Sequence, residues 1–510
     1  MLSSIHTALL LGIDAFPVQM EVDLSRSGIP AFRMVGLAEG AVKESKDRVF
    51  TALKNSGFRV PPSRITVNLA PAHLRKEGSG YDLPLALGIL VACEVIPPEK
   101  ISPFLCMGEL SLKGEVKPVT GVLSVAMMAR ERGIKGLILP ADNAPEAAVV
   151  KGIDVYGVCS LVEAVGFLIG EKGLSPVRVG MEDIWKRSRE KFFIDFSEVK
   201  GQEHAKRAIE VAAAGGHNLL FIGPPGSGKT MLAQRIPTVL PLLDFEEALE
   251  VTRIYSVAGM LSQKEPLVTK RPFRAPHHTI SDAGLIGGGR YPSPGEVSLS
   301  HKGVLFLDEL PEFKKHVLEV LRQPLEDGRV TISRASLSLT YPAEFMLVAA
   351  MNPCPCGYLG DKRHQCTCSP LQIQRYKNRL SGPLLDRIDL HVEVGAVPYE
   401  ELSSNREGAH SKGMRERIQR TRFIQKERYK SLPFSLNSRL SGKWLTRFCQ
   451  LDERGHSFLE KAVDSLGLSA RAHSRILRIA RTIADLNQSP SIEVSHLAEA
   501  ISYRTLDRLR

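Results

Sequence analysis

The stretch of the chain whose residue types most clearly predict chemistry is a glycine-rich loop between an apolar segment and a helical pattern. The loop consists of Gly223, Pro224, Pro225, Gly226, Ser227, Gly228, Lys229 and Thr230. Its spacing, G-x-x-x-x-G-K-[ST], lets successive backbone N–H groups surround phosphates at the positive end of the following helix. The lysine then contacts the β- and γ-phosphates, and the threonine hydroxyl holds Mg²⁺. The sequence therefore predicts a site for a nucleoside triphosphate and Mg²⁺, with Lys229 and Thr230 in these roles.

A pair of acidic residues, Asp308 and Glu309, follows a second apolar segment, residues 304–307. Acids at the carboxyl end of a buried parallel strand lie where α/β sheets bind ligands. We expect Asp308 to hold Mg²⁺ through its water shell and Glu309 to polarise the water that attacks the γ-phosphate. A third apolar segment, residues 345–350, precedes Asn352, whose amide would help to place that water. These residues together predict ATP hydrolysis.

Arg387 lies further along the chain, on an expected surface turn in residues 383–390. An arginine supplied by a neighbouring subunit can stabilise the charge of the transition state. The alternative for a single surface arginine is a salt bridge. The position of Arg387 after both strand motifs favours the catalytic interpretation.

Four of the eight cysteines form two pairs separated by nine residues: Cys354 and Cys356, then Cys366 and Cys368. A loop containing Gly357 and Gly360 lies between the pairs and can bring four thiolates around one tetrahedral zinc ion. The C-x-C spacing is tighter than that of most zinc sites, so reduced thiols without a metal are the alternative. His364, in the same loop, could replace one cysteine ligand. We favour structural zinc, because clustered cysteines in a cytosolic protein bind metal more often than they form disulfides.

Length and composition indicate a multidomain globular protein. A chain of 510 residues exceeds what one core supports, and its 43% hydrophobic and 24% charged residues are typical of folded proteins. We expect residues 1–170 to form a domain that mixes strands and helices, and residues 171–194 to be a linker. Residues 195–395, where strands and helices alternate, predict a parallel α/β sheet. Residues 396–510 have a helical periodicity and predict a helical domain.

The net charge of +11 is concentrated towards the C-terminus, where residues 401–510 hold 21 Lys and Arg against 12 Asp and Glu. The densest part, residues 406–430, contains Arg415, Arg417, Arg420, Arg422, Lys426, Arg428 and Lys430. Such a surface suits a polyphosphate partner, and a solvated helix face is an equal alternative.

No segment predicts a membrane span or a secretory signal. The longest apolar run, residues 83–93, is too short to cross a bilayer and contains Pro84. The first residues lack the basic region of a signal peptide. We therefore expect a cytoplasmic protein without membrane contact.

The order of these motifs resembles that of AAA+ ATPases of the magnesium-chelatase/MCM branch. Three strings, FRAPHH at 273–278, GEVSLSH at 295–301 and MNPCPCG at 351–357, look like those of the ComM/YifB family. The resemblance covers essentially the whole chain. It implies an AAA+ ATPase core with a parallel sheet, residues 195–395, a basic helical lid of magnesium-chelatase type, residues 396–510, and assembly into a homo-oligomeric ring, a hexamer.

The resemblance also implies roles for single residues. Asn352 would be sensor 1, Arg387 the arginine finger that acts on the neighbouring subunit, and Arg471 sensor 2, with Arg475 as the alternative. An adenine pocket is implied near residues 199–202, with Val199 and Gln202 as binding residues.

Residues 75–87 and 107–119 look like the proteolytic domain of Lon, which has a ribosomal-S5-like α+β fold and a Ser–Lys dyad. Aligned on these strings, the nucleophile falls at Gly80, with Ser79 one position off, and the dyad lysine falls at Leu123. A nucleophile needs its base within hydrogen-bond reach, and Lys117 is the residual candidate base. We therefore expect residues 1–170 to be a non-catalytic domain for scaffolding or DNA contact, without peptidase activity.

Three functions are compatible with this ATPase. The family resemblance implies a DNA motor that promotes branch migration and strand integration during natural transformation, alongside recombination proteins. Its sequence-independent partner would be single-stranded or branched DNA, bound by the basic C-terminal block and by Arg274, His277, His278 and Arg290 in the segment between the ATP motifs. The alternatives are a metal-chelatase motor subunit and a protein-remodelling factor with a pore-loop aromatic, for which Phe273 and Tyr291 are weak candidates.

Overall fold

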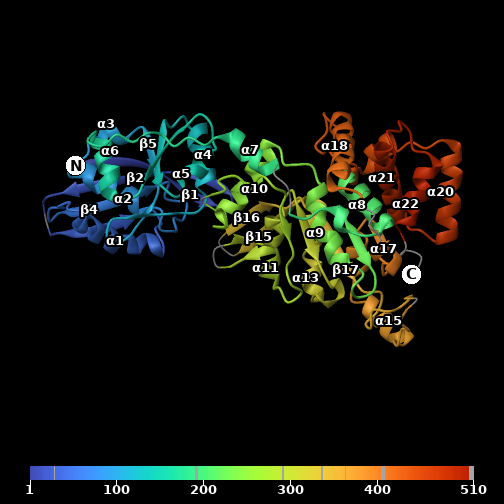
Figure 1. The fold of residues 1–510 in the computed structure, drawn as a ribbon. Helices are drawn as coiled ribbons and strands as arrows, with labels where there is room; N and C mark the ends of the chain where they lie inside the picture. Colours follow the sequence, from blue (N-terminus) through green and yellow to red (C-terminus); the bar gives the residue numbers. More distant parts are fainter. Residues whose placement is uncertain are drawn as a thin grey trace. The chain divides into compact units, whose positions relative to one another are not determined.

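The computed structural model describes residues 1–27, 29–189, 193–262, 264–289, 292–334, 337–361, 363–403 and 408–504. Arg290 and Tyr291, named above as candidates, lie outside these ranges. The chain divides into two compact units (Figure 1). Unit 1 comprises Met1–Arg189 and Phe245–Thr269, and unit 2 comprises Glu190–Asp244 and Lys270–Arg510. Residues 245–269 thus pack with the N-terminal residues, although they follow the phosphate loop in the chain. The predicted domain boundaries stay a prediction.

Unit 1 is built on a seven-stranded mixed sheet. In spatial order its strands are β3 (Ala31–Val35), β4 (Arg64–Ala70), β2 (Asp14–Ser25), β1 (Leu2–Leu11), β5 (Phe104–Cys106), β8 (Gly136–Pro140) and β9 (Asp154–Val158). β1 and β2 are antiparallel, as are β2 and β4, whereas β1, β5, β8 and β9 are parallel. In β1 and β2 buried residues alternate with exposed ones over much of each strand, because successive side chains point to opposite faces.

The centre of unit 1 is α2 (Asp82–Ala92), in which every residue is buried. A helix that is apolar on all sides belongs in a core, and Pro84 is tolerated because it lies in the first turn, where backbone N–H groups have no helical partner. The other helices of this unit are α1 (Ala41–Asn55), α3 (Pro98–Ile101), α4 (Val122–Glu131), α5 (Ala144–Ala147), α6 (Leu161–Ile169), α7 (Met181–Arg189) and α10 (Phe245–Val257). α7 lies in the predicted linker. A short ribbon is formed by β6 (Glu109–Leu110) and β7 (Val116–Lys117).

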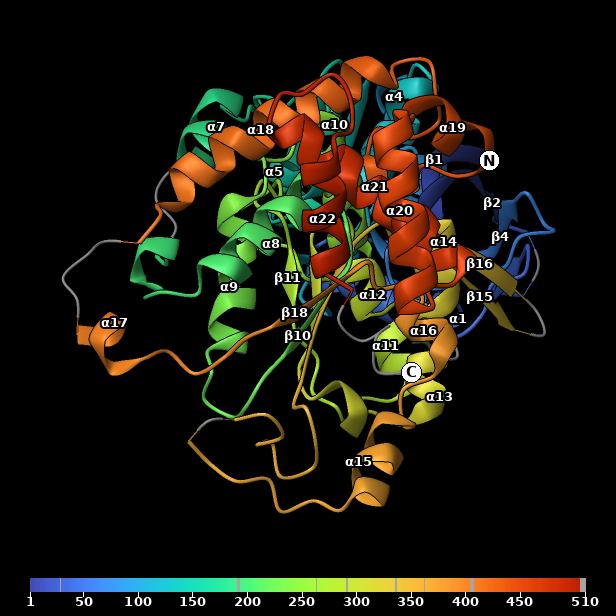
Figure 2. The ribbon, with the colours of Figure 1, turned by 90° about the vertical axis from the view of Figure 1, so that its right-hand side faces the viewer.

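Unit 2 contains a five-stranded sheet in which every neighbouring pair is parallel. Its strands are, in order, β11 (Phe273–Arg274), β14 (Val304–Leu307), β17 (Met346–Met351), β10 (Leu219–Ile222) and β18 (Leu390–Glu393). β14, β17 and β10 are buried at every position, as expected of strands covered on both faces. Parallel strands end at one edge of a sheet, so the residues that follow β10, β14 and β17 lie at a common edge. Figure 2 shows β10 beside its other neighbour, β18.

Helices and short ribbons surround this sheet. The helices of the ATP-motif region are α8 (Glu203–Gly215), α9 (Lys229–Val239), α11 (Asp282–Ile286), α12 (Glu296–Leu299), α13 (Lys315–Glu319), α14 (Arg322–Asp327), α15 (Pro370–Lys377) and α16 (Gly382–Leu385). Two antiparallel ribbons pair β12 (Gly287–Gly288) with β13 (Ser293–Pro294) and β15 (Arg329–Arg334) with β16 (Leu337–Pro342).

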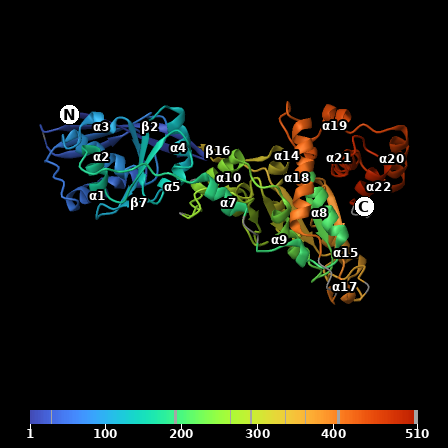
Figure 3. The same cartoon turned by 45° about the horizontal axis from the view of Figure 1, so that its top comes forward.

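The C-terminal residues of unit 2 are helical. Their helices are α17 (Tyr399–Ser403), α18 (Ser411–Arg428), α19 (Gly442–Phe448), α20 (Glu453–Leu466), α21 (Ala470–Leu486) and α22 (Val494–Ser502). α18 contacts α8, α9 and α21, so the helical region packs directly on the α/β core (Figure 3). The predicted fold class is confirmed: a parallel-sheet α/β core, a helical C-terminal region, and an N-terminal region that mixes strands and helices.

Candidate nucleotide site

The phosphate loop connects β10 to α9 at the carboxyl edge of the unit 2 sheet. The Gly223 N–H donates to the Met351 carbonyl oxygen at 3.2 Å, which ties the start of the loop to the end of β17. A Cβ at Gly223 would lie 2.0 Å from the Val394 carbonyl oxygen, so only glycine fits there. Gly226 and Gly228 have φ values of 75° and 88°, which other residues rarely adopt. The loop is therefore curled as a phosphate cradle requires.

Lys229, the first residue of α9, points back into this loop. Its Nζ donates to the carbonyl oxygens of Gly223 and Pro224 at 2.7 and 2.9 Å, and to Asn352 Oδ1 at 3.2 Å. Burial lowers the pKa of this lysine. Ser227 Oγ is buried and has no hydrogen-bond partner among the described residues. An ammonium held inside the curl and an unsatisfied hydroxyl beside it fit a triphosphate, whose oxygens would accept from both.

The residues predicted to hold Mg²⁺ are brought together. Thr230 Oγ1 donates to Asp308 Oδ2 at 2.8 Å, which joins the start of α9 to the end of β14. A hydroxyl and a carboxylate at this separation are hard oxygen ligands that suit Mg²⁺. The geometry thus agrees with the predicted pairing of Thr230 and Asp308.

Glu309 has an unusual backbone and an unexpected partner. Its φ is 51°, in the left-handed region, and its N–H donates to Asp308 Oδ1 at 2.9 Å. Its Oε2 lies 3.3 Å from His278 Nδ1. From the sequence we expected His278 near a DNA strand, whereas the structure pairs it with the predicted catalytic carboxylate. Only the closeness of His278 to the ATP motifs in the chain could have suggested this.

The two residues predicted to border the adenine, Val199 and Gln202, lie in unit 2. Val199 is fully buried in the core of unit 2. Gln202 has a φ of 60°, and its Nε2 donates to the Gly395 carbonyl oxygen at 2.6 Å. Gly395 follows Val394, whose carbonyl oxygen borders Gly223. Gln202 is therefore joined to the phosphate loop through residues 394–395.

The arginine predicted as the finger and the two sensor-2 candidates have partners elsewhere in unit 2. Arg387 pairs with Glu326 and also donates to the Pro383 carbonyl oxygen at 2.6 Å. Arg471 pairs with Asp386 at 3.0 Å and is 70% exposed. Arg475 is 11% exposed and lies 3.4 Å from Asp389. Of the two sensor-2 candidates, Arg471 is thus the more exposed.

The four clustered cysteines converge. Their Sγ atoms all lie within 4.8 Å of one another, close enough to hold one metal ion. Cys354 is buried and the other three are partly buried. His364, the alternative ligand, instead lies beside Asp361 at 3.7 Å and against the Tyr358 ring, outside this group.

The basic run on α18 is largely engaged within unit 2. Arg415 donates to the Thr238 carbonyl oxygen at 2.8 Å, and Arg422 donates to the Ala213 carbonyl oxygen at 2.9 and 2.6 Å. Arg417 and Arg428 form ion pairs with Glu210 of α8 and Asp485 of α21. These four arginines fasten α18 to the ATPase core and to α21, so the charge count overstates the basic surface that the run offers to a partner.

The Lon-like positions of unit 1 do not form a dyad in the described residues. Ser79 donates to Glu109, and Lys117 pairs with Glu115 at 2.8 Å. Leu123, at the dyad-lysine position, is fully buried. Loss of peptidase activity stays a prediction, and this geometry agrees with it.

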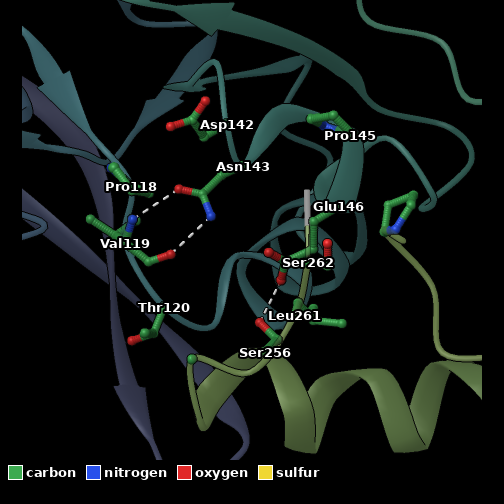
Figure 4. Close-up of a pocket in the computed structure, with 12 residues that line it drawn as sticks. Pro118, Val119, Thr120, Asp142, Asn143, Pro145, Glu146, Ser256, Leu261 and Ser262 are labelled. Carbon is green, nitrogen blue, oxygen red and sulfur yellow. Dashed lines mark hydrogen bonds between the residues drawn. The ribbon is translucent and has the colours of Figure 1, made fainter. Parts of the chain in front are cut away.

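Unit 1 also contains a cavity of about 280 Å³ between residues 118–120, 142–146, 256–262 and Pro266 (Figure 4). Asn143, which lines the cavity, forms two hydrogen bonds with the Val119 backbone. It accepts from the N–H and donates to the carbonyl oxygen, both at 2.9 Å. Glu146 accepts from Ser256 of α10, and burial raises the pKa of Glu146. This cavity lies where α10 and the residues after it pack against the rest of unit 1.

Comparison with known proteins identifies the family. A model described as "Magnesium chelatase, subunit ChlI" matches residues 195–402, its C-terminal counterpart matches residues 408–504, and "Subunit ChlI of Mg-chelatase" matches residues 20–143. Within the described ranges, no helix combines the length and apolar character that a membrane span requires.

Individual relatives agree with these matches. The chain is 45% identical to Competence protein ComM of Haemophilus influenzae over 512 residues, covering 100% of this chain and 98% of that protein. It is 45% identical to the uncharacterized protein YifB of Escherichia coli over 509 residues, with the same coverage. The magnesium-chelatase 38 kDa subunit of Cereibacter sphaeroides is 26% identical over 39% of this chain and 58% of its own length. The chain therefore belongs to the ComM/YifB family of magnesium-chelatase-like AAA+ ATPases.

Proposed function

We propose that this protein is an ATP-driven, ring-forming DNA motor that promotes branch migration and strand integration during natural transformation in the cytoplasm. The observation that carries the ATPase part is the convergence of Lys229, Thr230, Asp308 and Asn352 at one edge of the unit 2 sheet. The DNA part is supported by 45% identity, over the whole chain, to a protein named for competence. Single-stranded or branched DNA is the proposed partner, together with recombination proteins.

In this proposal the site residues have distinct roles. Bound ATP supplies the transferable γ-phosphate, and its Mg²⁺ neutralises the developing charge. Lys229 binds the phosphates, while Thr230 and Asp308 hold the metal. Glu309 takes up a proton from the attacking water as a general base, and Asn352 orients that water. Val199 and Gln202 border the adenine.

Arg387 is proposed to act on the nucleotide of the neighbouring subunit, and Arg471 is proposed to be sensor 2. Arg387 and Arg471 pair with Glu326 and Asp386 rather than with the phosphate loop, among the residues described. An arginine that serves a neighbour's nucleotide has no need to reach its own. We therefore propose a homo-oligomer, a hexameric ring, in which Arg387 is the arginine finger and Arg471 is sensor 2.

The cysteine cluster is proposed to bind structural zinc. Thiolates 2.3 Å from a tetrahedral zinc ion are about 3.8 Å apart. The separations here are 3.4 Å between the Sγ atoms of Cys354 and Cys356, 3.7 Å between those of Cys354 and Cys366, and 3.6 Å between those of Cys356 and Cys366. Metal analysis of purified protein should give one zinc per chain. Its absence from the wild type would remove this part of the proposal.

The test of the motor is the steady-state ATPase rate of the purified protein with and without single-stranded and forked DNA. We expect DNA to stimulate hydrolysis, and the stimulation to fall steeply with salt because phosphate contacts release counterions. Lys229→Ala should abolish the activity. Glu309→Gln should bind ATP but not hydrolyse it, and steady turnover by that variant would contradict the role given to Glu309.

A rate indifferent to every DNA would instead favour a protein client, as in a remodelling factor or a chelatase-type motor. Because the basic run on α18 is largely engaged within unit 2, the net charge is weak evidence for DNA binding. Stimulation of the ATPase by DNA is the stronger test. A pull-down through unit 1 in the full-length chain would then identify the client.

A further inference from the structure

The loop that carries the cysteine cluster lies directly on the phosphate loop. Gly357, one residue after Cys356, has a φ of 89°. A Cβ at this position would lie 2.6 Å from Pro225 Cδ and 2.9 Å from Pro225 Cγ. Those distances leave no room for any side chain, so the backbone at Gly357 packs tightly against the third residue of the phosphate loop.

The same short segment contacts the phosphate loop at two further points. The Met351 carbonyl oxygen accepts from the Gly223 N–H at 3.2 Å, and Asn352 Oδ1 accepts from Lys229 Nζ at 3.2 Å. The Cys354 carbonyl oxygen accepts from the Gly357 N–H at 3.0 Å, which closes a turn. Residues 351–357 therefore touch the start, the middle and the lysine of the loop.

The second cysteine pair, Cys366 and Cys368, contacts this segment through Cys368. Cys368 Sγ accepts from the Cys356 N–H at 3.4 Å. Between the pairs, Asp361 Oδ1 accepts from the N–H groups of Arg363 and His364 at 2.6 and 2.9 Å. Thiol contacts are weak, whereas a tetrahedral metal bonded to four thiolates would fix both pairs to one point.

We propose that the tetrathiolate metal site braces the ATP site: the bound metal fixes residues 354–357, and these residues hold Pro225 and Asn352 in the geometry that hydrolysis requires. The inference rests on the proposed ATPase activity and zinc site, and it adds a role for the metal. The cysteines and Gly357 are positioning residues that act through Pro225 and Asn352. The alternative is a metal that only stabilises the fold.

Two glycines of the same loop give a matched pair of variants. Gly357 and Gly360 both have positive φ, 89° and 80°, so alanine strains the backbone at both. Only at Gly357 does the new methyl group collide with Pro225, because nothing lies within 4 Å of a Cβ at Gly360. In the full-length protein we expect both variants to keep one zinc per chain.

The activities of the two variants should differ. Displacing catalytic groups by about 1 Å costs on the order of 100-fold in rate, so kcat of Gly357→Ala should fall between about 10- and 100-fold. Gly360→Ala should stay within about twofold. The KM for ATP should rise, though by a smaller factor than kcat falls, because Pro225 belongs to the phosphate loop whereas Asn352 acts on the attacking water. Equal kcat values for the two variants, with zinc bound in both, would overturn the brace.

The metal itself is tested by removing it from the intact protein. An organomercurial that displaces zinc from thiolates should lower kcat in step with the zinc released, and added thiol and zinc should restore it. Cys159→Ser, which removes an exposed cysteine outside the cluster, serves as the control and should behave as wild type. An unchanged kcat after complete zinc release would overturn the proposal.

These outcomes are separable from failure of the proposed function. If the wild type hydrolyses no ATP under any condition, the ATPase proposal fails, and the brace is then judged by the binding of a fluorescent ATP analogue. Weaker binding by Gly357→Ala than by Gly360→Ala would support the brace. Equal affinities would overturn it.

Discussion

At the scale of single residues, Glu309 is held in a backbone conformation that glutamate seldom adopts. Its φ of 51° costs on the order of 1–3 kcal/mol, which the surrounding structure must offset. Its carboxylate is also engaged by His278 Nδ1 at 3.3 Å. A carboxylate that is paired with a histidine is held in one orientation, and its paired oxygen must leave the histidine before it can contact an attacking water. We therefore interpret the pair as a state of the site in which the Glu309 carboxylate is held back from the attacking water.

From this geometry we predict that His278→Ala raises the ATPase rate in the absence of DNA. Release of Glu309 from its partner should increase the basal kcat, by up to about tenfold, since general bases contribute 10²- to 10⁴-fold in all. The ratio of the DNA-stimulated to the basal rate should fall. Both rates are measured by steady-state phosphate release.

The neighbouring histidine provides the control for this prediction. His277 Nδ1 lies 3.0 Å from Thr279 Oγ1, whereas the described partner of the Glu309 carboxylate is His278. His277→Ala should leave the basal rate near that of wild type. A basal rate that falls in His278→Ala would show that the histidine assists Glu309 rather than restraining it.

At the scale of elements, Arg253 and Ser256 of α10 bond to distant segments of unit 1. Arg253 donates to Ser124 Oγ at 3.2 Å and to the Ile13 carbonyl oxygen at 2.9 Å, and it pairs with Asp14 at 2.5 Å. Ser256 donates to Glu146 (Figure 4). These contacts join residues more than a hundred positions apart in the chain, so α10 depends on tertiary bonds.

We predict that Arg253→Met loosens α10 without unfolding the protein. Hydrogen bonds to charged groups are worth about 1.5–3 kcal/mol, so local opening should become roughly 10- to 100-fold more frequent. Hydrogen–deuterium exchange of residues 245–257 in the full-length protein measures this opening. Arg178→Met, which removes an exposed pair with Asp154, should not change that exchange. Equal protection in Arg253→Met and wild type would contradict the role of Arg253.

The elements also show how far the sequence can predict this structure. The apolar runs before Gly223, Asp308 and Asn352 predict β10, β14 and β17, because buried parallel strands are apolar throughout. The amphipathic period of α21 likewise reports its buried face. Pairing of distant residues leaves no such pattern. The local sequence therefore does not predict that His278 contacts Glu309, or that α10 packs against the N-terminal residues.

The charge of α18 illustrates the same limit. A run of basic residues predicts a cationic surface only if the side chains lack acidic or carbonyl partners. Glu210 and Asp485 lie far from α18 in the chain, yet they pair with Arg417 and Arg428. The composition of the run gives its charge, but it does not show which of the charged side chains are already paired within the protein.

At the scale of the whole molecule, the proposed ring requires that each ATP site contain residues of two subunits. In one chain Lys229 contacts Asn352 and the phosphate loop, whereas Arg387 pairs with Glu326. A chain with Lys229→Ala keeps its arginine, and a chain with Arg387→Ala keeps its phosphate loop. Each variant alone should have little activity, since every site lacks one essential group.

Mixing these two inactive variants should restore hydrolysis. With random assembly of equal amounts, about a quarter of the sites combine an intact Lys229 with a neighbour's intact Arg387, so the rate should approach a quarter of wild type if sites act independently. The measurement is the ATPase rate of the mixture after subunit exchange, with each variant at the same total concentration as the reference. Mixing Lys229→Ala with Asp308→Ala is the control, because both changes disable the same side of the site and restore nothing. A mixture of Lys229→Ala and Arg387→Ala that stays inactive, although light scattering shows mixed rings, would place Arg387 in the site of its own chain.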